Sequence, residues 1–214
     1  MKERGKENNF KKFWKKFWWV VWKDDSFKGW LISLIFIFVV IKFIFFPILT
    51  LTTGTSLPLA IVESCSMYHK GDIFGNFDNW FTRHGEKYNS WEIDRETFAD
   101  FNLKKGFNKG DILFIVRANP DKLKVGDIII FNAGEKNPVI HRIMNITTNS
   151  ETGEKIFSTE GDNNNGQLEQ EISINDNQIV GKAAFRIAPF IGWGKLIFFE
   201  AQRPEYEKGL CKEN

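Results

Sequence analysis

Residues 125–143 read VGDIIIFNAGEKNPVIHRI and contain two stretches typical of β-strands. The run of β-branched residues after Gly126-Asp127, a turn signal, predicts a buried strand that ends at Phe131. Residues 139–143 form a second run, VIHRI. The same arrangement occurs upstream, where Gly110-Asp111 precedes ILFIV. These segments predict a sheet in the second half of the chain.

Further strand candidates lie at residues 59–62, 155–159 and 178–187. Strands do not alternate regularly with helices, which argues against a parallel sheet. We therefore expect a mainly β, antiparallel domain over residues 52–214. Residues 71–108 form a polar, aromatic-rich insertion with one expected helix near residues 90–103, in which Ser90 is the cap and Trp91, Phe98 and Phe101 face inward.

Residues 29–51 are apolar except for Ser33, Lys42 and Thr50. This is about the length that crosses the roughly 30 Å hydrocarbon core as a helix. Lys42 is unfavourable there, at about 2.5–3.5 kcal/mol near a helix centre, unless its ammonium group reaches the interface. A cleavable leader is the alternative, but the run is long and no small-x-small site follows closely. We expect a transmembrane anchor.

The segment before this anchor, residues 1–28, carries nine basic and four acidic residues. The positive-inside rule then places the N-terminus in the cytoplasm of a single-pass protein of the cell membrane, with residues 52–214 outside. Within the segment, aromatic and apolar residues recur at helical spacing opposite four lysines. This predicts a basic amphipathic helix that lies among the lipid headgroups rather than packing on its own domain. The apolar residues on that face are Phe10, Phe13, Trp14, Phe17, Trp18 and Val21.

Near the C-terminus, residues 187–199 are apolar but interrupted by Pro189, Gly192, Gly194 and Lys195. The run is too short for a second span. We expect an edge strand or a segment that dips into the membrane surface.

Two serines, Ser64 and Ser66, follow the first strand candidate in the run IVESCSM at residues 61–67. A serine nucleophile needs a base, and the base needs a partner that orients it. His141 is the best candidate base, because a strand would hold its ring rigidly. His69 is close to Ser66 in sequence, and His84 lies in the insertion.

Asp162 is a candidate for the orienting acid, although the surrounding sequence GDNNNG is also a good turn. The two cysteines, Cys65 and Cys211, have no metal-site spacing. Two states are open. We favour unpaired cysteines over a disulfide, which can form outside the cytoplasm but would tie the serine turn to the extreme tail. Cys65 remains a rival nucleophile, which would require a lowered thiol pKa.

Taken in order, five motifs resemble signal peptidase I, in the archaeal and endoplasmic-reticulum branch that uses histidine rather than lysine. The resemblance covers about residues 61–191 of this chain. The motifs are SCSM at 64–67, KGD at 109–111, VGDIIIF at 125–131, HRI at 141–143 and GDNN at 161–164.

This resemblance implies that Ser66 is the nucleophile, His141 the general base and Asp162 the acid. It implies that Ser64 donates to the oxyanion. The family often has a second aspartate six residues after the first, where this chain has Leu168. Glu169 and Asp176 are both open as substitutes. The family also commonly has proline where His69 stands.

The resemblance implies a membrane-anchored serine endopeptidase that removes signal peptides from exported pre-proteins. Its partners would be those signal peptides, the lipid bilayer and the translocase. The net charge of +2 does not argue for nucleic-acid binding, and no metal or cofactor is implied. The alternative is an inactive, membrane-tethered β domain that binds peptides or partner proteins.

Overall fold

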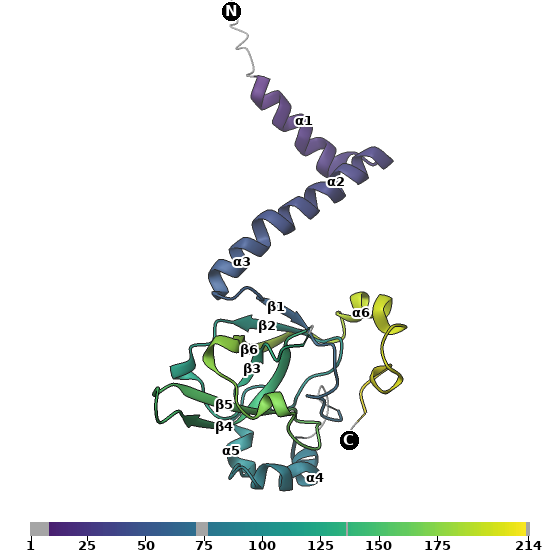
Figure 1. The fold of residues 1–214 in the computed structure, drawn as a ribbon. Coiled ribbons are helices and arrows are strands. Elements are labelled where there is room, and N and C mark those ends of the chain that lie inside the picture. Colours follow the sequence, from purple (N-terminus) through teal and green to yellow (C-terminus); the bar gives the residue numbers. More distant parts are fainter. Residues whose placement is uncertain (1–8, 72–76, 136, 213–214) are drawn as a thin grey trace, which may run out of the picture. The chain divides into compact units, whose positions relative to one another are not determined.

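The structure is a computed structural model that describes residues 9–71, 77–135 and 137–212, apart from the side chain of Tyr206. The chain divides into two compact units, residues 1–52 and 53–214. Each unit is described by itself. Figure 1 labels the helices and strands of both.

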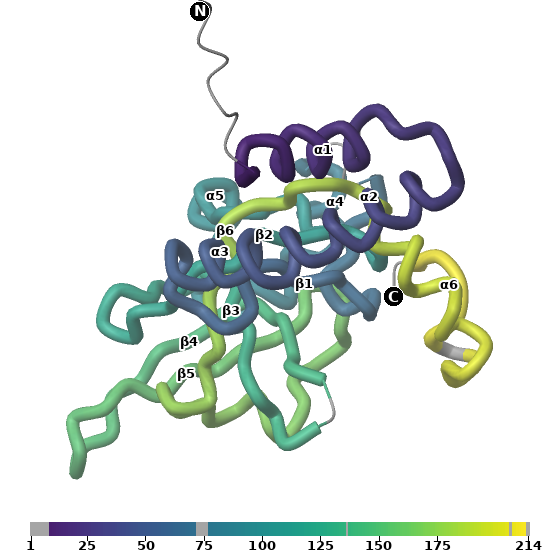
Figure 2. The backbone as a smooth tube through the Cα atoms, turned by 90° about the horizontal axis from the view of Figure 1, so that it is seen from above, coloured from purple at the N-terminus to yellow at the C-terminus, as the bar shows by residue number. Residues whose placement is uncertain are grey.

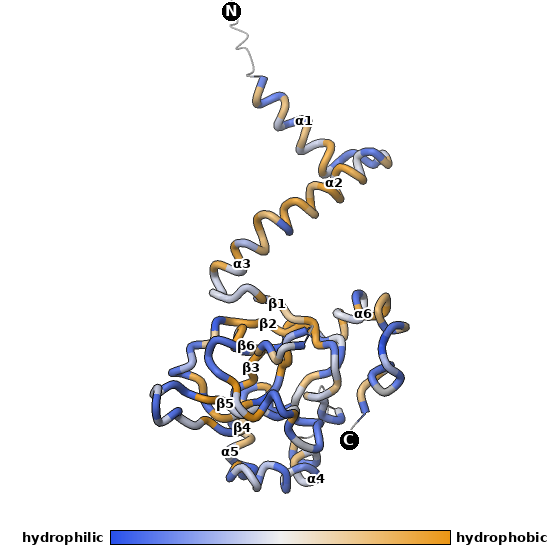
Figure 3. The backbone as a smooth tube through the Cα atoms, in the orientation of Figure 1, coloured by the Kyte–Doolittle hydropathy of each residue, from blue (hydrophilic) through white to orange (hydrophobic). Residues whose placement is uncertain are grey.

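The first unit contains the apolar helix that the sequence predicts. The helix is α2 (Phe27–Val40), a π-helical turn η1 (Ile41–Phe45) and α3 (Phe46–Thr53). The Ser26 hydroxyl caps its start by accepting from the Gly29 amide at 3.1 Å. Residues Phe27–Thr53 form one helix of 27 residues that is long and apolar enough to cross a membrane. Figure 3 shows its hydrophobic colouring.

A second helix, α1 (Asn9–Lys23), precedes this apolar helix and packs against its first turns. The Ser33 hydroxyl donates to the Val21 carbonyl at 2.6 Å, and the Phe17 and Phe36 rings meet edge to face at 5.4 Å. The helix is thus amphipathic as predicted, but part of its aromatic face is occupied by α2. The sequence did not predict this contact with α2.

The second unit is built on one curled antiparallel sheet of six strands, and the predicted mainly β fold is confirmed. The strand order is β1-β2-β6-β3-β4-β5. The strands are β1 (Leu59–Ile61), β2 (Ile112–Val116), β3 (Ile128–Phe131), β4 (Val139–Thr148), β5 (Lys155–Glu160) and β6 (Ile179–Ala188). Strand β3 is buried along its whole length, as its run of β-branched residues predicts.

The insertion forms two helices rather than the predicted single one. They are α4 (Phe77–Asn89) and α5 (Arg95–Ala99). Asp94, not Ser90, caps the start of α5 by accepting from the Thr97 amide at 2.8 Å. Ser90 follows α4 and donates to the Lys87 carbonyl. The insertion packs its own aromatic cluster against Met144 of β4; the buried members include Trp80, Phe81, Tyr88 and Phe98.

Within the described residues, short 3₁₀ turns lie between or after these elements: η2 (Pro120–Lys122), η3 (Glu169–Glu171), η4 (Asp176–Gln178) and η5 (Glu205–Glu207). The predicted edge strand at residues 187–199 is instead mostly a helix, α6 (Trp193–Glu200), which follows β6. Figures 1 and 2 show α6 and the residues after it standing to one side of the sheet.

Candidate active site

A groove of about 590 Å³ lies beside β1, the edge strand of the sheet. The predicted site residues Ser64, Ser66 and His141 all line it. Apolar side chains from β1 and from the start of β4, including Ile61 and Ile140, form much of the remaining wall. The fold therefore brings the two serines and the histidine, far apart in sequence, to one cavity.

The two serines lie in the turn that follows β1. Their hydroxyl oxygens are 3.1 Å apart, within hydrogen-bond distance. The turn is fixed from both sides. Met67 is buried and its carbonyl accepts from the Phe107 amide at 3.0 Å, while the Ser66 carbonyl accepts from the Asn163 amide at 2.7 Å.

The glycine of the GDNN motif is needed for this close approach. A Cβ at Gly161 would lie 2.8 Å from the Ser66 carbonyl oxygen and 2.8 Å from the Asn164 amide nitrogen. Since Cβ atoms do not approach so closely, any larger residue would push the 161–164 loop away from the serine turn.

His141 lies on β4, where it pairs in register with Ile129 of β3 and is almost fully buried. Its Nδ1 is hydrogen-bonded to the carboxylate of Glu171, at the end of η3. The same carboxylate accepts from the Thr159 hydroxyl at 3.1 Å and from the Leu168 amide at 2.9 Å. These contacts fix the imidazole ring, and Nε2 is the ring nitrogen left for a serine hydroxyl.

Asp162 has different partners from those that the sequence predicts. Its carboxylate accepts from the Arg142 guanidinium at 2.9 and 2.7 Å, pairs with His69 Nε2 at 2.9 Å, and accepts from the Tyr88 hydroxyl at 3.1 Å. All four side chains are buried. In the described part of the chain, the carboxylate bonded to the His141 ring is Glu171.

Sequence reasoning missed Glu171. The resemblance leaves Glu169 and Asp176 as substitutes for the family's second aspartate. In the structure, the 3₁₀ turn η3 places Glu171 against the His141 ring instead. Glu169 is exposed on the same turn. The sequence carries no signal for this role: Leu168 has no side-chain acceptor and so makes no capping box, although the Glu171 carboxylate does accept from the Leu168 amide at 2.9 Å.

The Asp162 network has shifted pKa values. Burial alone would raise the pKa of the Asp162 carboxyl, but the adjacent Arg142 guanidinium and the His69 hydrogen bond hold it well below its usual range. Burial lowers the pKa of His69, although the hydrogen bond to Asp162 and the charge of that carboxylate act in the opposite direction and raise it. Burial and the Asp162 charge raise the pKa of Tyr88. The network is therefore a buried ion pair surrounded by two neutral rings.

Lys87 ties the insertion to the 161–164 loop. Its ammonium group donates to the carbonyls of Gly161 at 2.6 Å and Asn164 at 2.8 Å, and pairs with Glu160 at 2.9 Å. The insertion thus supports the loop that contacts Ser66.

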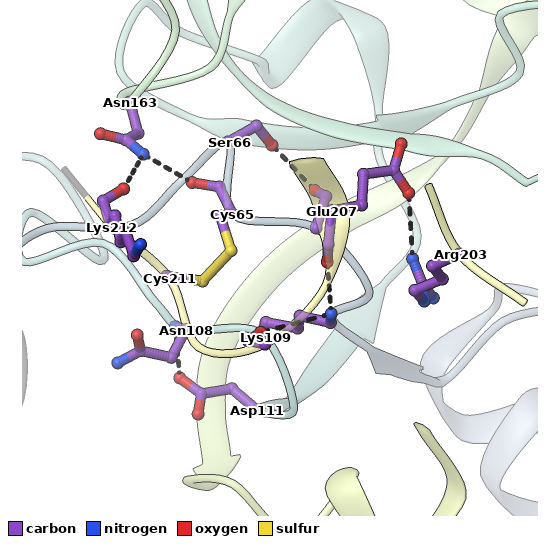
Figure 4. The surroundings of a disulfide bond; sticks show 12 residues. Cys65, Ser66, Asn108, Lys109, Asp111, Asn163, Arg203, Glu207, Cys211 and Lys212 are labelled. Carbon is purple, nitrogen blue, oxygen red and sulfur yellow. Dashed lines mark hydrogen bonds and ion pairs between the residues drawn. A yellow bond between two sulfur atoms is a disulfide. The ribbon is translucent and has the colours of Figure 1, made fainter. Parts of the chain in front are cut away.

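Cys65, between the two serines, forms a disulfide with Cys211. Figure 4 shows this bond next to Ser66. The structure has the disulfide, the alternative that the sequence disfavours, so Cys65 is not available as a thiolate nucleophile in this state. Among the residues that the structure describes, no group of three or more His, Cys, Asp or Glu side chains is arranged to hold a metal ion.

Comparison with known proteins finds similarity to catalytic subunits of the signal peptidase complex. The chain is 33% identical over 66 residues to the subunit SEC11 of Lachancea thermotolerans, covering 30% of this chain and 39% of the relative. It is 29% identical over 112 residues to the putative human subunit SEC11B, covering 50% of this chain and 66% of the relative. It is 25% identical over 111 residues to human SEC11C, covering 49% and 57%.

These similarities support a relationship to the signal peptidase I-like family. The matches span between about two fifths and two thirds of the length of these relatives. No family model matches the chain. These relatives are named as catalytic subunits of signal peptidase complexes, and this chain has an apolar N-terminal helix long enough to cross a membrane.

Proposed function

We propose that this protein is a membrane-anchored serine endopeptidase that removes signal peptides from exported pre-proteins. The observation that carries the proposal is the convergence of Ser64, Ser66 and His141 on one groove, with the His141 ring held by a buried carboxylate. The relatives are named as catalytic subunits of signal peptidase complexes, which supports the same reaction.

In this proposal, His141 Nε2 removes the proton from the Ser66 hydroxyl as Ser66 Oγ attacks the carbonyl carbon of the scissile bond. The Glu171 carboxylate keeps the proton on Nδ1 and stabilises the imidazolium that forms. His141 then gives the proton to the departing amine. Water releases the acyl group from Ser66, with His141 again acting as the base.

The developing oxyanion needs donors in a groove that excludes much of the water. The Ser64 hydroxyl, 3.1 Å from Ser66 Oγ, and the Ser66 amide are the proposed pair. One such donor contributes about 2.7–4 kcal/mol of transition-state stabilisation.

We assign the orienting role to Glu171 rather than Asp162. A carboxylate orients a catalytic histidine only if it bonds to the ring, and Glu171 does so. Asp162 would instead act structurally, by holding Arg142 and the loop behind Ser66.

The substrate would bind in extended form along the free edge of β1, which adjoins the serine turn. An extended peptide added to a sheet edge gains main-chain hydrogen bonds without demanding a long sequence motif. Small residues at the first and third positions before the scissile bond are the family's preference.

The helix Phe27–Thr53 would anchor the enzyme in the cell membrane, with the N-terminus cytoplasmic and residues 52–214 outside. This anchoring raises the local concentration of a membrane-bound substrate. The translocase is a further proposed partner.

The test is cleavage of a pre-protein by the full chain in detergent, comparing wild type with Ser66→Ala. Ser56→Ala is the matched control, since Ser56 is an exposed serine of the same unit outside the groove lining. We expect Ser66→Ala to abolish cleavage and Ser56→Ala to leave it unchanged. Equal processing by wild type and Ser66→Ala would exclude the assigned mechanism and leave a membrane-tethered binding domain as the better description.

A further inference from the structure

The residues after β6 form one wall of the groove. We call residues 193–212 the C-terminal strap; it comprises α6, the turn η5 and the chain up to Lys212. Lys195, Arg203 and Glu207 of the strap line the same groove as the two serines. A substrate in the groove would therefore touch the strap as well as the sheet edge.

Charged side chains connect the strap to the serine turn. Glu63, directly before Ser64, pairs with Lys195 at 3.1 Å and with Arg203 at 2.9 Å. Lys195 is about half exposed, so its pair with Glu63 holds the strap only weakly. Arg203 is 15% exposed, and its pair with Glu63 is the better shielded of the two.

A stronger contact is made at Lys109, in the KGD motif. The Lys109 ammonium group is buried and bonds to the Glu200 carboxylate and the Glu207 carbonyl, each at 2.7 Å. It also lies 5.0 Å from the centre of the Trp193 ring. The Lys109 hydrogen bond lowers the pKa of Glu200. This contact fixes the beginning and middle of the strap.

The end of the strap is held by the Cys65–Cys211 disulfide and by hydrogen bonds. The Gly209 amide donates to the Glu200 carboxylate at 2.6 Å, and the Lys109 ammonium group donates to the Gly209 carbonyl at 3.4 Å. The Asn163 amide group donates to the Cys65 carbonyl at 3.1 Å and to the Lys212 carbonyl at 2.9 Å, as Figure 4 shows. Beyond Glu207 the strap has no regular secondary structure within the described residues. The disulfide is the covalent restraint that keeps the segment after Glu207 next to the serine turn.

We infer that the Cys65–Cys211 disulfide holds the end of the strap against the serine turn and so completes a substrate-binding wall, with the consequence that pre-protein affinity depends on the redox state of these two cysteines. Reduction by a dithiol transfers two electrons and two protons to the bond, which gives two cysteine thiols and oxidises the dithiol to a disulfide. The part of the strap beyond Glu207 then loses its covalent link to the serine turn, while Lys109 still holds the Glu200 carboxylate and the Glu207 carbonyl. The enzyme would work best in an oxidising compartment.

This inference rests on the proposed function and is tested by kinetics on the full chain in detergent. Wild type, Cys65→Ala/Cys211→Ala and Arg203→Ala are compared on one pre-protein, with and without dithiothreitol. For oxidised wild type treated with dithiothreitol, we expect KM to rise at least fivefold while kcat stays within twofold. The double variant should show the raised KM under both conditions. Arg203→Ala keeps the disulfide and should raise KM by itself, because it removes one side chain from the wall.

Trypsin digestion provides a separate measurement of the strap's position. Reduction should expose the cleavage site at Lys208, while residues 53–192 remain resistant and the thermal unfolding transition remains cooperative. If the double variant does not fold, Arg203→Ala and reduced wild type decide the question.

The outcomes separate the two hypotheses. If oxidised wild type and Ser66→Ala process the pre-protein equally, the proposed function fails. If wild type is active but reduction leaves KM and trypsin resistance unchanged, the strap inference fails. A fall in kcat without a rise in KM would also overturn it, because the disulfide would then act on Ser66 rather than on substrate binding.

Discussion

His141 and Glu171 are 30 residues apart in sequence, yet the imidazole Nδ1 and the carboxylate form a buried hydrogen bond. The carboxylate also accepts from Thr159 and from the Leu168 amide, so its orientation is fixed independently of the histidine. A buried carboxylate with its partners satisfied can hold a ring in one tautomer without moving.

We expect Glu171→Gln to lower kcat by about 10³- to 10⁴-fold, because the neutral amide stabilises neither the reactive tautomer nor the imidazolium. The measurement is single-turnover cleavage of a pre-protein. Glu169→Gln is the matched control, since Glu169 is exposed on the same 3₁₀ turn. Near-normal kcat for Glu171→Gln, in a folded protein, would return the orienting role to Asp162.

Asp162→Asn should act mainly on stability. It leaves the buried Arg142 guanidinium without its charged partner, which we expect to lower the free energy of unfolding by about 3–5 kcal/mol. Thermal unfolding monitored by circular dichroism gives the change. The exposed pair of Arg95 and Asp78 supplies the control, because Asp78→Asn should change stability by about 1 kcal/mol or less. A wild-type melting temperature in Asp162→Asn would contradict the structural role.

Ser64→Ala should lower kcat by about 10²- to 10³-fold with little change in KM, because the Ser64 hydroxyl is proposed to bind the oxyanion only as charge develops. Ser64→Thr retains a hydroxyl and should recover much of the loss. A rise in KM at constant kcat in Ser64→Ala would show that Ser64 binds the substrate's ground state instead.

The buried His69 predicts a pH dependence of stability. Its pKa is lowered in the folded state, so below about pH 6.5 the unfolded chain binds a proton that the folded chain does not. Stability is therefore full above that pH and should fall in acid, by up to about 1.4 kcal/mol per pH unit. His69→Gln should flatten the slope of the unfolding free energy between pH 6.5 and 5. The groups that face His69 are Asp162, Arg142 and His84. An unchanged slope in His69→Gln would assign the acid sensitivity to other groups.

The strands could be predicted because each is a short β-branched run after a turn signal. Strand β3, Ile128–Phe131, is buried on both faces and its sequence consists of large apolar residues. The helices of the insertion were harder to predict from the sequence. The expected helix at 90–103 is interrupted because Glu92 adopts a positive φ of 59° and Asp94 starts a new cap. The preceding helix, α4, buries Trp80, Phe81 and Tyr88. These three residues are spaced so that they lie on one face of a helix, and this helical spacing is visible in the sequence.

The site was predictable where a motif is local and unpredictable where the fold supplies a partner. Ser64, Ser66 and His141 stand in recognisable runs, and they line one groove. Glu171 has no motif around it, and its role depends on how η3 lies against β4 and β5. Asp162 stands in a recognisable motif, but its carboxylate accepts hydrogen bonds from the Arg142 guanidinium instead of from His141. A sequence indicates which groups are present more readily than it indicates which of them pair.

The disulfide also affects the unfolded chain. Cys65 and Cys211 are 146 residues apart, so the bond closes a loop that includes nearly all of residues 53–214. In the chain-entropy model, closing a loop of that length removes conformational freedom from the unfolded state worth about 5 kcal/mol at 25 °C. The unfolded domain is therefore a ring rather than a free-ended coil, and a molecule that unfolds briefly keeps its serine turn within reach of its own tail.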